Sequence, residues 1–114
     1  MENARRKLYG ILKDDSSLTP FQRRVYAAVS AIPAGRVRSY KWVAEKIGSP
    51  GAFRAVGQAL KKNSYMGIVP CHRVIKSDGS LGGFSRGKRA KARLLASENA
   101  DYRGYFGRGF TRMS

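Results

Sequence analysis

The sequence contains very few of the residues from which disulfide frameworks and metal centres are built. Its 114 residues include a single cysteine, Cys71, and a single histidine, His72. One cysteine cannot close an internal disulfide, and one cysteine with one histidine cannot supply the four ligands of a structural zinc site. These absences exclude a small secreted scaffold stapled by disulfides or by a structural zinc ion.

Long hydrophobic runs are also absent. The longest nearly apolar run extends from Val25 to Ile32 and is interrupted by Ser30. It is far shorter than the roughly 18 residues of a membrane span. Residues 1–15 lack the apolar core of a signal peptide. We therefore expect an intracellular protein with no membrane partner, and a length that fits one compact domain.

Acidic residues are scarce as well. Seven Asp and Glu stand against 23 Lys and Arg, so the formal net charge is +16. Such a surface attracts polyanions, and nucleic acid is the first candidate because the neutralisation of phosphates releases condensed counterions. An anionic membrane would more often be met by a basic amphipathic helix. A basic surface that merely keeps the protein soluble is the alternative interpretation.

The residue pattern divides the chain into three parts. Residues 1–18 are polar and charged and predict a leader with little structure, and residues 19–98 predict the folded domain. Residues 99–114 alternate glycine, arginine and aromatic residues. This tail could stack its rings on bases while its arginines meet phosphates, and a frayed or partly docked end is the plainer alternative.

Three helices are predicted in the first half of the domain. Thr19 can cap one helix with Pro20 at its first position, and Ser39 can cap a shorter helix that Gly48 ends. A third, basic helix is predicted over 52–62, directly after a tight turn. Two short helices joined in this way form a helix-turn-helix, which can lay its second helix along a DNA groove.

The helical periodicity is lost after Asn63. Val74-Ile75 predicts a short buried strand, Asp78-Gly79 predicts a turn, and Lys88–Glu98 predicts a last helix. The expected fold class is therefore mainly α with a small β element.

Cys71 and His72 are the residues from which nucleophilic chemistry could be built. A cysteine reacts as its thiolate, and a histidine oriented by a carboxylate can take the proton directly or through a water. Adjacent side chains on a strand point to opposite faces, so the pair needs a bridging water or a bent backbone after Pro70. Glu98 is the best candidate to orient the imidazole, because the end of the last helix can fold back onto the site. A buried cysteine beside a structural histidine is the alternative.

The run Pro70-Cys71-His72-Arg73-Val74, preceded by Arg54-Ala55-Val56-Gly57, resembles the O6-alkylguanine-DNA alkyltransferases, also called methylated-DNA-protein-cysteine methyltransferases. The resemblance covers about Leu18 to Glu98. It implies a winged helix-turn-helix that enters the minor groove and swings the damaged guanine out of the duplex into a pocket that holds the cysteine. The cysteine would take the alkyl group in one irreversible step without metal or organic cofactor, so that the protein is consumed. The partner implied is double-stranded DNA containing O6-alkylguanine, bound by a monomer.

The resemblance also implies roles in catalysis and DNA binding. His72 would deprotonate Cys71 through a water, and Glu98 would fix the imidazole. Arg54 would fill the gap left in the duplex. The residues beside it on the basic helix that would also belong to the DNA-binding surface are Ala55 and Gly57.

The remaining matches concern the substrate and the support of the site. Tyr40 would contact the flipped nucleotide, and the backbone around Val74 and Ser85 would read the guanine edge. Asn63 would brace the turn beneath the site, and Arg73 would help to hold the motif together.

The sequence departs from the family pattern in the loop expected over the guanine. Phe84 stands where many relatives carry Tyr, and Arg86 stands where a small residue is frequent. These side chains predict a faster reaction with methyl than with bulky adducts. The usual N-terminal domain has no counterpart in the 18 residues before the first helix, which indicates a minimal member or a fragment.

Two other functions are compatible with the same features. Alkyltransferase-like proteins match in size, bind alkylated DNA without transferring the group, and typically carry Trp where this chain has Cys71. A DNA-binding regulator or architectural protein with an inert thiol is the second alternative. The cysteine makes transfer the preferred hypothesis.

Overall fold

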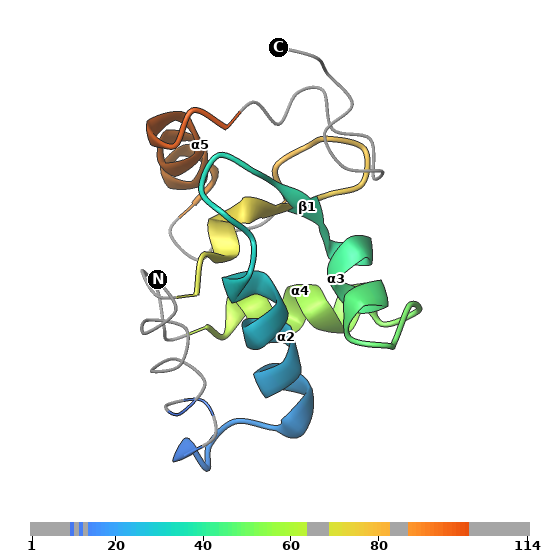
Figure 1. The fold of residues 1–114 in the computed structure, drawn as a ribbon. Helices are drawn as coiled ribbons and strands as arrows, with labels where there is room; N and C mark the ends of the chain where they lie inside the picture. The colour runs from blue at the N-terminus through green and yellow to red at the C-terminus, as the bar shows by residue number, and fades with distance from the viewer. Residues whose placement is uncertain (1–9, 11, 13, 64–68, 83–86, 101–114) are drawn as a thin grey trace.

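The computed structural model describes residues 10, 12, 14–63, 69–82 and 87–100. The fold is mainly α with one two-stranded sheet, as the sequence predicts (Figure 1). The elements in chain order are α2 (Pro20–Ser30), β1 (Arg38–Ser39), α3 (Tyr40–Lys46), α4 (Phe53–Lys61), the 3-10 helix η1 (Cys71–Arg73), β2 (Val74–Ile75) and α5 (Lys88–Ser97). None of the helices in these residues is long and apolar enough to span a bilayer.

The predicted caps start the first two of these helices. Thr19 accepts a hydrogen bond from the backbone N–H of Gln22 at 3.0 Å, and the Gln22 side chain accepts one from the backbone N–H of Thr19 at 2.9 Å. Ser39 accepts from the backbone N–H of Trp42 at 2.9 Å and so begins α3. Gly48, with a φ of +81°, lies in the left-handed region and ends that helix.

Helices α2, α3 and α4 pack against one another around a shared apolar core. The fully buried side chains that they contribute include Val25, Val29, Val43 and Val56. The buried Tyr26 hydroxyl donates to the carbonyl of Ala59 at 2.7 Å and ties α2 to α4. The consecutive helices α3 and α4 form the predicted helix-turn-helix.

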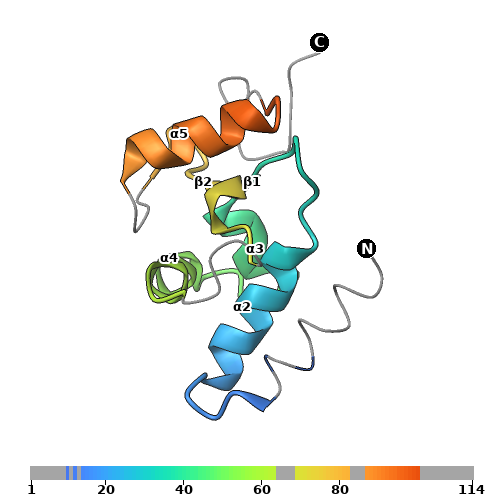
Figure 2. The ribbon, with the colours of Figure 1, turned by 90° about the vertical axis from the view of Figure 1, so that its left-hand side faces the viewer.

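The small sheet lies between this helical core and α5 (Figure 2). Its strands are parallel, with Arg38 paired to Val74 and Ser39 to Ile75. Because successive strand residues face opposite sides, Val74 packs into the helical core, and Ile75 packs into a second cluster with Leu95 of α5. The strand therefore joins two hydrophobic cores, and the site described below lies at their junction.

Part of the predicted leader also contacts the core. The Leu12 side chain is 3% exposed and belongs to the core of the helices. Arg23 of α2 donates to the carbonyl of Leu12 at 2.8 Å and to that of Asp15 at 2.7 Å. The chain before α2 is thus held at these points by the domain.

Candidate active site

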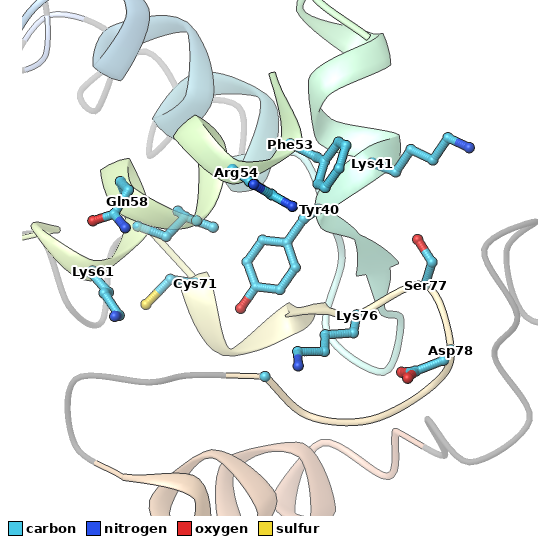
Figure 3. Close-up of a pocket in the computed structure, with 13 residues that line it drawn as sticks. Tyr40, Lys41, Phe53, Arg54, Gln58, Lys61, Cys71, Lys76, Ser77 and Asp78 are labelled. Atoms are coloured by element: carbon cyan, nitrogen blue, oxygen red, sulfur yellow. The ribbon is translucent and has the colours of Figure 1, made fainter. Parts of the chain in front are cut away.

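A cavity of about 670 Å³ opens between α4 and the loop that follows β2 (Figure 3). Cys71 lies on its wall and is 6% exposed. Figure 3 shows the Cys71 side chain between those of Lys61 and Tyr40. The other residues on the wall are Lys41, Phe53, Arg54, Gly57, Gln58, Leu60, Lys76, Ser77, Asp78 and Gly82. The thiol is therefore buried from bulk water but adjoins a space of ligand size.

The backbone conformation at Cys71 explains why the side chains of consecutive residues point in different directions. Cys71, His72 and Arg73 form one turn of 3-10 helix, and the strand begins only at Val74. A 3-10 helix has three residues per turn, so successive side chains point about 120° apart. Cys71 consequently faces the cavity, while His72 and Arg73 reach α5. The backbone after Pro70 is therefore bent, and the bend turns His72 toward Glu98.

Glu98, directly after α5, receives both of these side chains. Its Oε2 lies 3.0 Å from His72 Nε2, and its Oε1 accepts from Arg73 Nε at 3.0 Å. Arg73 also donates to Oε2 at 2.5 Å and to the carbonyl of Ile32 at 2.8 Å. Burial acts to raise the pKa of Glu98, but the hydrogen bonds from Arg73 and His72 outweigh it and hold that pKa below its ordinary value. A carboxylate is thus fixed against the imidazole.

Tyr40, the first residue of α3, lies at the cavity beside a buried lysine. Lys91 of α5 is fully buried and donates to the carbonyl of Leu81 at 2.5 Å and to the Tyr40 hydroxyl at a longer 3.5 Å. Burial lowers the pKa of Lys91 from 10.5 to about 8, while the charge of Cys71 acts in the opposite direction. Burial and, secondly, the charge of Cys71 raise the pKa of Tyr40. The phenol and the ammonium therefore share the electrostatic environment of the cysteine.

Two glycines allow the backbone to approach the Tyr40 ring. A Cβ on Gly57 of α4 would lie 3.9 Å from that ring, which is ordinary contact. Gly82 has a φ of +73°, and a Cβ there would lie only 2.9 Å from the Tyr40 hydroxyl. Any side chain at Gly82 would therefore displace the tyrosine or the loop.

The residues of α4 predicted to meet DNA lie on its exposed side. Arg54 and Gly57 line the cavity, whereas Ala55 is exposed and does not line it. Four further residues of α4 line the cavity and were not predicted as site residues, namely Phe53, Gln58, Leu60 and Lys61. Their spacing from Arg54 and Gly57 on one helical face was the available signal.

Of the other residues predicted for the site, Asn63 and Val74 belong to the described part of the structure. Asn63 is buried and donates to the carbonyl of Val69 at 3.3 Å, close to the turn before Cys71. Val74 is buried in the core and does not line the cavity, and its backbone N–H donates to the carbonyl of Cys71. Ser85, like Phe84 and Arg86, lies outside the described residues. Within the described ranges, no group of three His, Cys, Asp or Glu side chains could hold a metal ion.

The fold and the site together define a helix-turn-helix domain with a cysteine on the wall of a cavity and a histidine held by a carboxylate behind it. The family model described as "6-O-methylguanine DNA methyltransferase, DNA binding domain" matches residues 20–100, and the chain belongs to this family. The resemblance found in the sequence is thereby confirmed.

Three known proteins illustrate the similarity. A "Methylated-DNA--protein-cysteine methyltransferase" from Mycolicibacterium paratuberculosis is 53% identical over 78 residues, which are 68% of this chain and 47% of that protein. The crystal structure of Mycobacterium tuberculosis OGT in complex with DNA matches with a TM-score of 0.71 and 49% identity, over 72% of this chain and 51% of the other. S. pombe Atl1 in complex with damaged DNA containing O6-carboxymethylguanine matches with a TM-score of 0.65 and 37% identity, over 71% of this chain and 77% of that one. The chain spans about half the length of the curated methyltransferases it matches.

Proposed function

We propose that the protein repairs DNA by transferring an alkyl group from O6 of guanine to Cys71, and that each molecule reacts once. The observation that carries the proposal is the position of the buried thiol on the wall of a cavity of about 670 Å³. A cysteine enclosed on all sides by apolar side chains could not meet a purine. The methyltransferase names of its relatives support the same reaction.

In the proposed reaction, His72 takes the thiol proton through a water molecule and Glu98 holds the imidazole. The contact of 3.0 Å between His72 Nε2 and Glu98 Oε2 supports this arrangement. The thiolate then attacks the alkyl carbon, so that a sulfur–carbon bond forms while the bond to O6 breaks. The proton lost by the thiol is returned to the leaving guanine, and the thioether that remains is not hydrolysed. The step needs no metal or organic cofactor.

DNA binding is proposed to proceed through α4 in the minor groove, with the alkylated guanine extruded into the cavity. A base in the stack cannot present its O6 substituent to a buried sulfur, so extrusion is required by geometry. Arg54, on the cavity wall, is proposed to occupy the vacated place in the duplex, and Tyr40 to contact the flipped nucleotide. Backbone groups around Val74 and Ser85 are proposed to read the guanine edge. The M. tuberculosis relative whose structure contains DNA supports a DNA partner.

A second candidate function is binding of the lesion without transfer. The match to S. pombe Atl1, whose structure contains DNA with O6-carboxymethylguanine, supports binding of alkylated DNA. Cys71 at the cavity wall favours transfer. We further propose that the protein acts inside the cell, because its proposed substrate is cellular DNA. We also propose that it binds this DNA as a monomer.

Intact-mass measurement separates these candidates. The chain is incubated with a duplex containing one O6-methylguanine, and Cys71→Ala serves as the control. Transfer predicts a mass increase of one methylene unit in the wild type and none in the variant. Selective binding of the alkylated duplex without a mass change would indicate a lesion-binding protein. Equal binding of alkylated and unmodified duplexes, again without a mass change, would indicate a regulator with an inert thiol.

A further inference from the structure

Phe53 is an exposed aromatic side chain at the rim of the cavity. It is 43% exposed, it is the first residue of α4, and it lines the cavity next to Arg54. The other large hydrophobic side chain left exposed in the described part of the chain is Leu94 of α5, at 36%, which does not line the cavity. When a partner covers an apolar ring that was exposed to water, the free energy of the complex is lowered.

Residues on the same face of α4 as this ring also line the cavity. Phe53, Gly57 and Lys61 follow one another at intervals of four residues and all line the cavity. Gly57 has no side chain, and the Tyr40 ring lies against the helix at this position. Figure 3 shows the Phe53 ring above the Tyr40 ring, with the Arg54 side chain beside them. Two aromatic rings and one guanidinium thus border the entrance, and all three have flat faces that suit flat bases.

The charges around the rim indicate the chemical class of the partner. Four cationic side chains line the cavity, and Asp78 is the acid among the described residues that line it. The four cations are Lys41, Arg54, Lys61 and Lys76. An apolar partner surface would not require this ring of charge, whereas the phosphates on both sides of an opened base pair would.

We propose that Phe53 is a second DNA-inserting side chain, an apolar wedge that packs on the base next to the vacated position. This inference rests on the proposed function. Extruding a guanine leaves two unstacked base faces, and minor-groove proteins cover such faces with inserted apolar side chains. Arg54 can bond to the polar edge of the orphaned base but leaves the neighbouring base face uncovered. Phe53, one residue away on the same helix, supplies the ring that covers it.

The test compares two substitutions of Phe53 with a matched control. Phe53→Gln removes the apolar ring, Phe53→Leu keeps an apolar wedge, and Leu94→Gln makes the same kind of change away from the cavity. Each variant is given two substrates: a duplex with one O6-methylguanine, and the free base O6-benzylguanine, which needs no extrusion. A 2-aminopurine beside the lesion reports unstacking, and circular dichroism checks the fold.

Phe53→Gln should slow transfer from the duplex and weaken binding to it about tenfold, the scale expected for the loss of one base–aromatic contact. Its rate with the free base should fall much less than its rate with the duplex, and Phe53→Leu and Leu94→Gln should both react with the duplex nearly as the wild type does. The increase in 2-aminopurine fluorescence should be lost in Phe53→Gln alone.

Two results would overturn the proposal that Phe53 acts as a wedge. One is a Phe53→Gln variant that matches the wild type in duplex binding and fluorescence. The other is an equal loss with the free base, which would make Phe53 part of the pocket rather than of the DNA contact. If the wild type transfers from neither substrate, the proposed function fails, and the binding and fluorescence measurements still decide the role of Phe53.

Discussion

At the scale of the residue, Glu98 joins the catalytic histidine of the proposed mechanism to the rest of the fold. It accepts hydrogen bonds from Arg73, and its carboxylate lies against His72, both of which extend from the turn that carries Cys71. Because its pKa is lowered in the folded state, its stabilising contribution is complete above the ordinary pKa of a glutamate, about 4.3, and is lost as the pH falls through the lowered value.

Glu98→Gln should therefore destabilise the protein in a pH-dependent manner. At pH 7 we expect a loss of about 1 to 2 kcal/mol, since charge-assisted hydrogen bonds are replaced at a site that solvent partly screens. The difference from the wild type should shrink as the pH falls below the ordinary pKa of a glutamate and through the lowered pKa of Glu98. Urea unfolding at several pH values measures this, with the exposed Glu45→Gln of α3 as the control. A difference that stays constant with pH would contradict the assignment.

Lys91 carries the second residue-scale prediction. Its pKa is about 8 in the folded chain against 10.5 for an ordinary lysine. Between these values the unfolded chain binds more protons than the folded one, so the stability contributed by this position rises with pH. In a Cys71→Ala background, which removes the charge of Cys71 from the surroundings of Lys91, the stability of the Lys91 protein relative to Lys91→Met should increase from pH 8 to 9.5 by about 1 kcal/mol per pH unit. A flat difference would mean that Lys91 keeps its charge throughout.

Burial of a lysine could not have been predicted from its own residue type. Lysine is almost never fully buried unless it is paired. The one signal in the sequence is that Lys91 precedes Leu95 by four residues and so shares its helical face. What makes the burial possible is the Leu81 carbonyl, which belongs to a loop with no periodicity to analyse. Cys71, His72 and Glu98, in contrast, could be predicted as one group from the sequence, because a reactive thiol needs a base and the base needs a carboxylate that orients it.

At the scale of the element, two helix caps allow a matched comparison. Thr19 caps α2 away from the cavity, and Ser39 caps α3 directly before Tyr40. Thr19→Ala and Ser39→Ala should each reduce the free energy of unfolding by about 1 kcal/mol, because each removes a side-chain acceptor from a helix N-terminus. Only Ser39→Ala should also slow alkyl transfer, since it loosens the residue that lines the cavity. Urea unfolding and transfer rates measure the two effects, and equal rates for both variants would contradict the link.

The helices could be predicted from the sequence because their ends are encoded locally. Thr19 and Ser39 each accept a hydrogen bond from the backbone N–H three residues later, and Gly48 turns the backbone with its positive φ. The boundaries of α2 and α3 therefore follow from a few neighbouring residues. The turn at Cys71–Arg73 and the pairing of β1 with β2 depend on contacts between distant segments. A strand of two residues such as Arg38–Ser39 is too short to carry an alternating pattern.

At the scale of the whole molecule, the site depends on both hydrophobic cores. Cys71 and Val74 pack with the three helices, whereas Leu95 anchors α5 and with it the positions of Lys91 and Glu98. The turn that carries Cys71 is therefore held from two sides. The exposed face of α4 remains available, and Figure 2 shows α5 on the other side of the sheet from it.

This separation makes the salt dependence of DNA binding a test of where the charge of +16 acts. Each phosphate contact contributes about −0.9 to the slope of log affinity against log salt concentration. Lys61→Gln, on the cavity wall, should reduce the magnitude of that slope by about 1, whereas Arg93→Gln, exposed on α5, should leave it nearly unchanged. The rate of transfer from the free base O6-benzylguanine should not vary with salt, because no phosphate takes part. Fluorescence anisotropy with an unmodified duplex between 50 and 200 mM salt measures the slopes. Equal changes for the two variants would mean that DNA senses the diffuse charge of the whole surface and that α4 is not the docking face.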